Sequence, residues 1–549
     1  EGDSTFGNGT EINVVNEGGG RTVKIYDRLT AQIAYMLALY RHRPALISRL
    51  NAFIDNYVKN KQSTRGFIGD HTQIINCQSL KNIAVESYVH IEGANRLENG
   101  TIAGDANDPT FIGSGVFAKN FIVQSGANID NSAVLTDVFI GQSVKIGRQF
   151  SAENCAFFAN CEAFHGEACS ILAGPYTVSH HKSTLLIAGL FSFYNAGSGT
   201  NQSNHMYKLG PNHQGILHRG AKTGSLSYLL WPCAIGPFSV VIGKHYSNFD
   251  ASDLPFSYIN EENNRSVLTP AMNLLTVGTR RDSQKWPSRD RRTGSVKFDL
   301  IHFDLFSPFI IGKVVKATEI LNELHARASK ENEYVSYKGL YIKRLLLKTC
   351  RKYYELAIKI FIGDCIASIL NEFNFEGGLD LLSSRAQPAS FEWIDLCGMF
   401  APTSVIDDLL DRIEKRDITA LDEITGSLQA IHQDYPALKW NWCRQLIQKM
   451  YGASMEELSK EQLNQIMTDW KTNRVKLNNL IIQDAAKEFD QNARIGYGLD
   501  GGASAKEHDF EAVHGAVESN QFIKNLRDET HLVERLCEKI QKWIDRVKT

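Results

Sequence analysis

The sequence lacks any run of roughly eighteen apolar residues, the length at which a segment becomes a candidate transmembrane helix. Its ten cysteines contain no CxxC pair and no short framework spacing, which argues against a disulfide scaffold and favours buried, reduced thiols. An excess of one charge is also absent, because the formal net charge is −2, and this argues against a general nucleic-acid surface. We expect a cytoplasmic protein without membrane or nucleic-acid partners. The sequence begins at Glu1 and not at a Met. The position of the native start, and whether a signal peptide was removed, are therefore left open.

A six-residue repeat of apolar positions dominates residues 68–187. This period fits neither an amphipathic helix nor a long alternating strand. It predicts a parallel β-helix, in which three hexapeptides close each triangular turn and send one apolar side chain per face into a shared core. We expect Ile129, Leu135, Ile140 and Ile146 to be buried there. The series with this spacing are Ile68, Ile74 and Leu80; Val85, Ile91 and Leu97; Val123, Ile129 and Leu135; and Ile140, Ile146, Ala152, Phe158 and Phe164.

The length of 549 residues favours two or three domains, and the patterns divide the chain into four parts. Residues 1–62 read as a lead-in followed by two short helices, which would cap the first open turn of the solenoid. The β-helix covers 63–262, a basic connector covers 263–305, and helical periodicity covers 306–549. Within the β-helix the period breaks at 190–227, a stretch rich in Gly, Asn, Ser and His. Long excursions of this kind are usually functional.

Two resemblances extend this interpretation. "FIGQSVKIG" (139–147) resembles the hexapeptide-repeat transferase superfamily, which implies a left-handed coil, trimers, and acyl transfer from acyl-coenzyme A to a sugar or sugar nucleotide. "YDRLTAQIAYMLALYRHRP" (26–44) and "NAGSGTNQSNHMYKLGP" (195–211) resemble an uncharacterised bacterial β-helix family with a helical C-terminal extension. That second resemblance extends over nearly the whole chain and implies no activity.

The excursion at 190–227 is the candidate catalytic segment. It contains His205, His213 and His218, and superfamily enzymes typically use a histidine on or near such a loop as general base. We expect the excursion to wall a polar pocket, with His213 as the first choice of base. The alternative is that these side chains only satisfy the backbone of the loop. The side chains expected to bind the sugar are Asn201, Asn204, Asn212, Gln214 and Arg219.

The pair His213 and His218, with His181 upstream, is also similar to the zinc ligands of the gamma-class carbonic anhydrases. The pair lies outside the clean repeat, so we do not expect a tightly bound metal. Zinc binding stays as an alternative to the general-base interpretation.

The connector is strongly basic between residues 276 and 292. Arginines beside an aromatic ring could hold the phosphates and base of coenzyme A or a sugar nucleotide. The alternative is a solvated linker, or a set of ion pairs to the helical domain. "VGTR" (277–280) is weakly similar to a phosphate loop of nucleotidyltransferases. The expected cofactor-binding side chains are Arg280, Arg281, Lys285, Trp286 and Arg289.

Two function classes follow. The first is an acyltransferase that uses acyl-coenzyme A and a loop histidine. The second is a non-catalytic scaffold or ligand-binding protein, in which the β-helix is a rod and the helices bind a partner.

Overall fold

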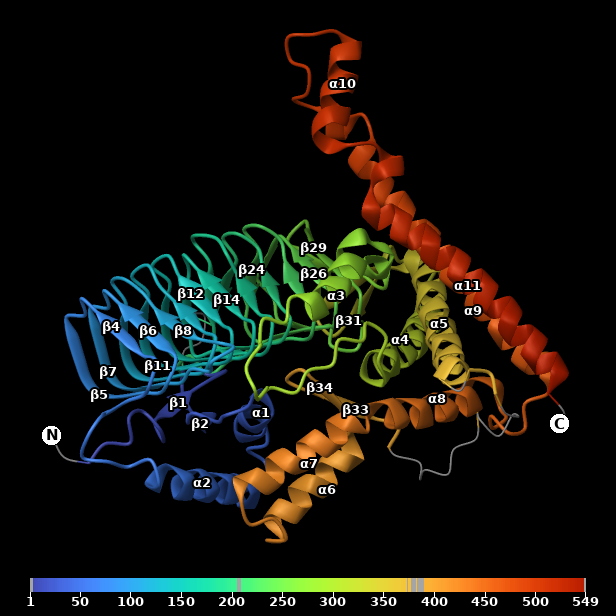
Figure 1. The fold of residues 1–549 in the computed structure, drawn as a ribbon. Coiled ribbons are helices and arrows are strands. Elements are labelled where there is room, and N and C mark those ends of the chain that lie inside the picture. The colour runs from blue at the N-terminus through green and yellow to red at the C-terminus, as the bar shows by residue number, and fades with distance from the viewer. Residues whose placement is uncertain (1–2, 205–208, 373, 377–381, 383–389, 548–549) are drawn as a thin grey trace.

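The computed structural model describes residues 3–204, 209–372, 374–376, 382 and 390–547 of the chain. It shows a parallel β-helix followed by a helical region at its C-terminal end (Figure 1). The β-helix runs from β3 (Phe67–Ile68) to β29 (Tyr258–Glu262). The predicted fold class, a parallel β-helix with a large helical C-terminal part, is therefore confirmed.

Three rows of parallel strands form the β-helix. Early in the chain, long strands bend across two of the rows, and after β13 each row has its own short strands. The long strands are β5 (Ser79–Val85), β7 (Arg96–Ile102), β9 (Phe117–Val123), β11 (Val134–Ile140) and β13 (Ser151–Phe157). The short strands that continue them are β15 (Glu167–Cys169), β16 (Leu172–Ala173), β18 (Leu185–Ile187), β19 (Gly189–Phe191), β21 (Asn201–Ser203), β22 (Gly215–Leu217), β24 (Tyr228–Leu230), β25 (Cys233–Ile235), β27 (Lys244–His245) and β28 (Phe249–Asp250). The third row contains β4 (Gln73–Ile75), β6 (Val89–Glu92), β8 (Thr110–Ile112), β10 (Asn128–Ile129), β12 (Lys145–Gly147), β14 (Glu162–Phe164), β17 (Val178–Ser179), β20 (Asn195–Ala196), β23 (Lys222–Thr223), β26 (Val240–Ile242) and β29.

The four core positions predicted from the repeat are buried. Ile129, Leu135, Ile140 and Ile146 are each at most 2% exposed and belong to one apolar cluster. Burying such side chains supplies about 25 cal/mol per Å² of apolar surface, so this column is the main stabilising feature of the solenoid.

The turn is one residue shorter than three hexapeptides. Ile129 pairs with Ile112 on one side and with Ile146 on the other, which gives 17 residues per turn. A strict period of six therefore slips by one residue in each of these 17-residue turns. Consequently Phe157 lies in the central core, whereas the predicted Phe158 is buried in a second cluster outside the solenoid.

The break predicted at 190–227 is mostly regular β-helix. Strands β19 to β23 continue through it, and the spacing of paired residues lengthens from 16 positions between Leu185 and Asn201 to 27 positions between Asn201 and Tyr228. The predicted excursion was therefore wrong over most of its length. Several of its polar residues are buried in these turns, among them Thr200, Gln202 and Thr223, and the hydroxyls of Thr200 and Thr223 hydrogen-bond each other at 2.8 Å.

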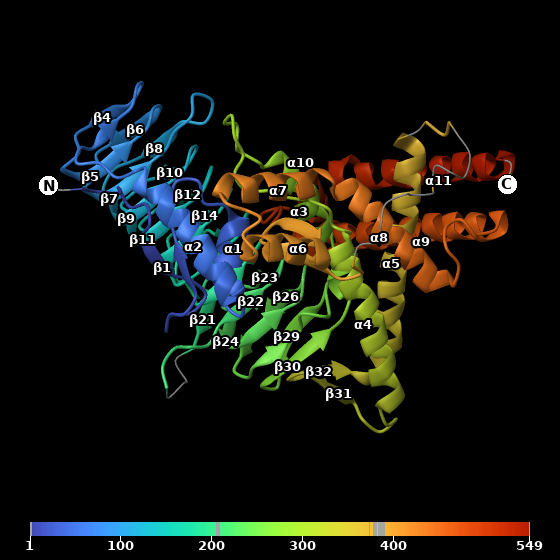
Figure 2. The same ribbon diagram turned by 90° about the horizontal axis from the view of Figure 1, so that it is seen from below.

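The N-terminal helices do not cap the first turn. Phe67, Ile68 and Leu80 at that end are 57%, 64% and 38% exposed. Helices α1 (Ala31–Leu39) and α2 (Pro44–Lys59) follow β1 (Glu11–Asn13) and β2 (Thr22–Lys24). They lie instead along the side of the β-helix, next to α6 (Thr403–Glu414) and α7 (Leu421–Gln433) (Figures 1 and 2). The outward-facing Phe139 and Phe158 share a buried cluster with them, so these helices cover aromatic rings on the side of the solenoid instead of its open end.

The helical region is packed against the solenoid. One apolar cluster continues from the β-helix core into α4 and α5. Helix α4 begins after Ser307, because the Ser307 hydroxyl accepts from the Ile310 amide and Pro308 occupies the first turn. Among the described residues, no helix is long and apolar enough to cross a membrane. The helices are α4 (Pro308–Arg327), α5 (Leu347–Glu372), α6 (Thr403–Glu414), α7 (Leu421–Gln433), α8 (Tyr435–Tyr451), α9 (Lys460–Ala486), α10 (Ala503–His514) and α11 (Gln521–Arg546).

Two hairpins interrupt the helical region, and a helical arm extends from it. A hairpin of β31 (Tyr334–Tyr337) and β32 (Leu340–Lys343) extends the third row of the solenoid through β30 (Arg265–Thr269), and a second hairpin consists of β33 (Trp393–Leu396) and β34 (Met399–Pro402). Helices α9 and α11 lie side by side and carry α10 at the far end of the arm (Figure 1).

Candidate functional site

The basic connector forms helix α3 (Val277–Ser288), which lies against the side of the β-helix. Trp286 anchors it, with its ring centroid 4.6 Å from that of Phe193 and 5.9 Å from that of Phe238. Between α3 and the strands β14, β17, β20 and β23 is a cavity of about 370 Å³, which we call the α3 groove. The groove is lined by Asn160, Glu162, Tyr176, Val178, His180, Phe193, Tyr194, Asn195, Lys222, Arg281, Asp282, Lys285, Trp286, Arg289 and Arg291.

The α3 groove is positively charged. Five basic side chains line it against the two carboxylates of Glu162 and Asp282. Burial lowers the pKa of Lys285, and the nearby charges of Arg281 and Arg289 lower it further. Such repulsion between neighbouring cations is relieved when an anion binds among them. The basic residues are Lys222, Arg281, Lys285, Arg289 and Arg291.

A histidine and a glutamate form a pair in the lining of the groove. His180 Nε2 lies 2.6 Å from Glu162 Oε2, and because a carboxylate can only accept, this nitrogen carries the proton. Arg291 Nη1 binds the other carboxylate oxygen at 2.7 Å. The hydrogen bond from His180 lowers the pKa of Glu162, with the charge of Arg291 adding to the effect. The arrangement fixes the tautomer of His180 and leaves its Nδ1 as an acceptor.

The buried hydroxyl of Tyr176 also belongs to the groove lining. Tyr176 is 5% exposed, and its ring is stacked on Phe193 with centroids 5.0 Å apart. Its oxygen has no hydrogen-bond partner among the residues that the structure describes. A buried hydroxyl without a partner is costly, so a ligand group that accepts from it would gain affinity.

The sequence-predicted cofactor residues divide between the groove and the helical region. Arg281, Lys285, Trp286 and Arg289 line the α3 groove. Arg280 points elsewhere and forms an ion pair with Glu529 of α11. Adjacent helical residues face different directions, which separates Arg280 from Arg281.

The predicted catalytic histidines do not meet in this groove. His213 is half-buried on the insertion between β21 and β22, and His205 lies outside the described residues. His218 lies beside Phe309, and burial lowers its pKa to about 3. A base with that pKa is poorly matched to neutral pH. Across the described part of the chain, no group of three His, Cys, Asp or Glu side chains is placed to hold a metal ion.

The predicted sugar-binding amides interact with backbone and with the N-terminal segment. The Asn204 amide donates to the carbonyls of Pro211 and His213, at 3.3 and 3.4 Å. The Asn212 carbonyl accepts from Asn16, and Gln214 accepts from Arg21 at 2.8 Å. Asn201 lies in β21 and pairs with Leu185 and Tyr228. The Asn204 contacts match the alternative in which the loop satisfies its own backbone, whereas Asn212 and Gln214 join it to the N-terminal segment.

The prediction that Arg219 binds substrate was wrong, because its guanidinium is enclosed by protein. Arg219 is 1% exposed, pairs with Asp395 at 2.9 Å, and donates to the carbonyls of His302 and Gly398, each at 2.6 Å. This network ties the β-helix to the β33–β34 hairpin, so Arg219 is structural.

The low pKa of His218 predicts a loss of stability in acid. The unfolded chain takes up the proton near pH 6.5 and the folded chain only near pH 3. This destabilisation is absent above pH 6.5 and grows as the pH falls towards 3, reaching about 2 kcal/mol at pH 5. The substitution His218→Phe should therefore lose less thermal stability than the natural chain between pH 7.5 and pH 5. The exposed His531→Asn variant is the control, and a parallel loss in all three proteins would contradict the expectation.

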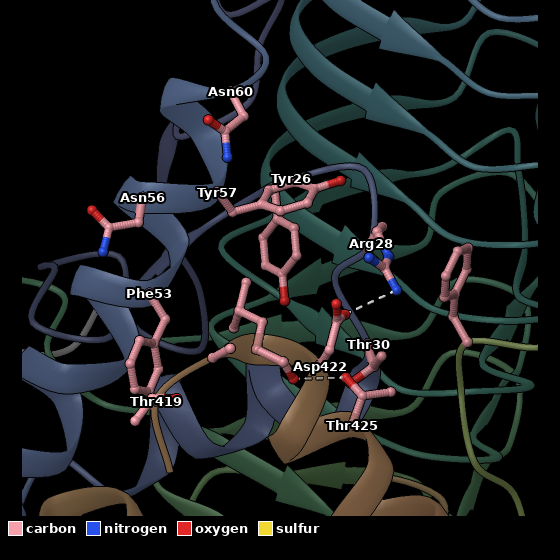
Figure 3. Close-up of a pocket in the computed structure, with 13 residues that line it drawn as sticks. Tyr26, Arg28, Thr30, Phe53, Asn56, Tyr57, Asn60, Thr419, Asp422 and Thr425 are labelled. Carbon is pink, nitrogen blue, oxygen red and sulfur yellow. Dashed lines mark hydrogen bonds and ion pairs between the residues drawn. The ribbon is translucent and has the colours of Figure 1, made fainter. Parts of the chain in front are cut away.

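A second cavity, of about 220 Å³, lies between α2, the segment around Tyr26 and the start of α7 (Figure 3). Arg28 and Asp422 on its wall pair with each other at 3.1 Å, so their charges cancel. The α3 groove, with its unbalanced cations and its histidine–carboxylate pair, is the better candidate for chemistry.

Comparison with known proteins places the chain in a family. Residues 1–325, more than half of the chain, match the family model described as "Domain of unknown function (DUF4954)". The chain belongs to the DUF4954 family. Residues 378–544 match a second model, described as "Domain of unknown function (DUF6819)". The α3 groove and its histidine–glutamate pair lie wholly within the DUF4954 part.

Individual relatives add little about activity. An uncharacterized protein of Treponema pallidum (strain Nichols) is 25% identical over 463 residues, which is 78% of this chain and 62% of that protein. The chain thus spans less than two thirds of the length of that protein. The structure of Arabidopsis UDP-N-acetylglucosamine acyltransferase is similar at 14% identity and a TM-score of 0.19, over 48% of this chain and 87% of that one. A similarity this low says nothing about activity.

Proposed function

We propose that the α3 groove binds a phosphate-bearing acyl donor such as acyl-coenzyme A, and that His180 is the general base of the transfer. The acceptor would be a hydroxyl or amine of a sugar or sugar nucleotide. The observation that carries the proposal is the 2.6 Å pair of His180 and Glu162 in the lining of a groove with five basic side chains. Geometry of this type combines a base with an anchor for phosphate.

The chemistry follows from the tautomer. His180 Nδ1, which has no hydrogen-bond partner among the described residues, takes the proton from the acceptor as its oxygen or nitrogen attacks the thioester carbonyl. The carbon–sulfur bond then breaks, and the imidazolium returns that proton to the leaving thiolate. Glu162, held as a carboxylate by Arg291, stabilises the transient positive charge on the ring.

The anchor for the donor comes from α3. Arg281 and Lys285 are one turn apart on the helix, so both side chains reach the same part of the groove. Hydrogen bonds from charged groups to phosphate are about twice as strong as neutral ones. The Tyr176 hydroxyl supplies one further donor. A groove that binds the donor but supports no turnover would fit the second function class, a ligand-binding scaffold.

Titration calorimetry with the full chain tests the anchor. Coenzyme A should bind, and the double variant Arg281→Ala with Lys285→Ala should weaken binding about tenfold or more. The reason is that each hydrogen bond to a charged group contributes about 1.5–3 kcal/mol, and 1.4 kcal/mol is tenfold. Added salt should also weaken binding, because exposed charges are screened.

Two controls make this test specific. Pantetheine, which carries no phosphate, should not bind measurably, and the exposed Arg327→Ala variant on α4 should behave as the natural chain does. Equal binding of coenzyme A by the double variant, or of pantetheine by the natural chain, would refute the phosphate anchor.

A further inference from the structure

The surface beside the α3 groove continues as a basic strip along one corner of the β-helix. Two shallow depressions follow the groove there. The first shares His180 and Glu162 with the groove, and the second shares Arg148, His165 and Lys182 with the first. The corner strip consists of Arg148, Phe164, His165, His181 and Lys182.

The strand register makes the corner strip a ladder. Gly147 pairs with Phe164, so Arg148 and His165, which follow them, occupy equivalent positions in consecutive turns. Ala163 pairs with Ser179, which places His181 at the same position one turn later. Neighbouring strands lie about 4.8 Å apart, so the side chains at this corner repeat at that interval.

The cations of the corner strip are not neutralised by the protein. Glu162 is the one carboxylate in the first depression, and His180 and Arg291 already bind it. Arg148 lies over the Phe164 ring at 5.1 Å, and neither Arg148 nor Lys182 has a carboxylate partner among the described residues. The Phe164 ring is already covered by Arg148 and packed against His180, with ring centroids 5.4 Å apart. The strip therefore offers a ligand its two uncompensated positive charges, which suit a saccharide that carries anionic groups.

We propose that the corner strip binds the acceptor, and that the acceptor is an acidic saccharide, with carboxylate or phosphate groups on Arg148 and Lys182. This inference rests on the proposed function, because it assigns the donor to the α3 groove. His180 lines both surfaces, so a base at that position lies between the donor on one side and the acceptor on the other. An oligosaccharide laid along the ladder would bring one residue beside His180.

The test measures binding of a galacturonate oligomer to the full chain without coenzyme A. Glucose 6-phosphate is the phosphate-bearing probe and cellobiose the neutral one. We expect at least one acidic probe to bind. The double variant Arg148→Ala with Lys182→Ala should bind that probe with an affinity lower by about tenfold or more. Both side chains are exposed, so the fold should be retained. Preference for the galacturonate oligomer or for the sugar phosphate identifies the anionic group, and either supports the proposal.

Matched variants separate this proposal from the donor site. The pair Lys81→Ala with Arg96→Ala removes the same two charge types from exposed positions of the first turns, and it should leave saccharide binding unchanged. The Arg148/Lys182 variant should bind coenzyme A normally, and the Arg281/Lys285 variant should bind the saccharide normally. If the natural chain binds the saccharide but not coenzyme A, the donor site is rejected and the acceptor strip is retained. Equal binding of cellobiose, or undiminished saccharide binding by the Arg148/Lys182 variant, would overturn the acceptor strip.

Discussion

Replacing Arg219 with alanine is expected to lower the free energy of unfolding by about 3–5 kcal/mol, the typical cost of removing one partner from a buried ion pair. The substitution would leave the Asp395 carboxylate, 8% exposed, without its cation. It would also leave the carbonyls of His302 and Gly398 without their donors. The guanidinium lies 4.2 Å from the Phe193 ring and 4.1 Å from the Phe400 ring, so packing is lost as well. Denaturant unfolding followed by circular dichroism measures the change.

Further variants separate charge from packing in this network. Adding Asp395→Asn to Arg219→Ala should recover part of the stability, because the uncompensated charge is gone. Arg219→Lys should recover little, since an ammonium cannot reproduce the fork of donors or the stacking between two rings. The exposed Arg96→Ala is the control and should change stability by no more than about 0.5 kcal/mol. If Arg219→Ala matches that control, the network does not hold the solenoid to the hairpin.

The repeat predicted the fold because every turn of a β-helix buries side chains in the same column. The exact register needed the three-dimensional structure. A period of six assigns Phe158 and Phe164 to the core, whereas the 17-residue turn selects Phe157 and Ala163. A one-residue slip moves a side chain to the opposite face of the strand. The outward Phe158 is nevertheless buried, because the N-terminal segment covers it. No local sequence pattern predicts that contact.

Composition misled the interpretation of residues 190–227. Corners of the solenoid need backbone in the left-handed region, and Phe193, Gly199, Gly220 and Leu226 supply it within this stretch. The many small and polar residues of this stretch resemble a loop when they are read locally. The strand pairs that continue the solenoid join residues up to 27 positions apart, as between Asn201 and Tyr228. A pattern read over a short stretch of sequence does not predict strand pairs at that separation.

The site was partly visible in the sequence. The basic stretch could be recognised, but the choice of Arg281 over Arg280 depends on the rotation of α3. Glu162 and His180 are separated by about one turn, so the turn length was the signal that could have paired them. The buried pairing of Arg219 with Asp395 joins residues 176 positions apart, and only tertiary structure reveals it.

Replacing His180 with alanine is expected to reduce acyl-transfer turnover by about 10²–10⁴-fold, the usual contribution of a general base. The binding of coenzyme A should be nearly unchanged, because the base acts mainly in the transition state. Glu162→Gln should give an intermediate loss, since the amide keeps the shape but not the charge that stabilises the imidazolium. Release of free thiol from acyl-coenzyme A in the presence of an acidic saccharide measures turnover.

His213→Ala is the decisive companion variant, because His213 was the first choice of base from the sequence and lies outside the α3 groove lining. The structure-based proposal expects His213→Ala to retain turnover, as should the exposed His531→Ala on α11. If His213→Ala loses turnover and His180→Ala keeps full activity, the general base is His213, on the insertion between β21 and β22, and not His180. Binding of coenzyme A with no turnover in the natural chain would instead identify the groove as a ligand-binding site without acyl transfer.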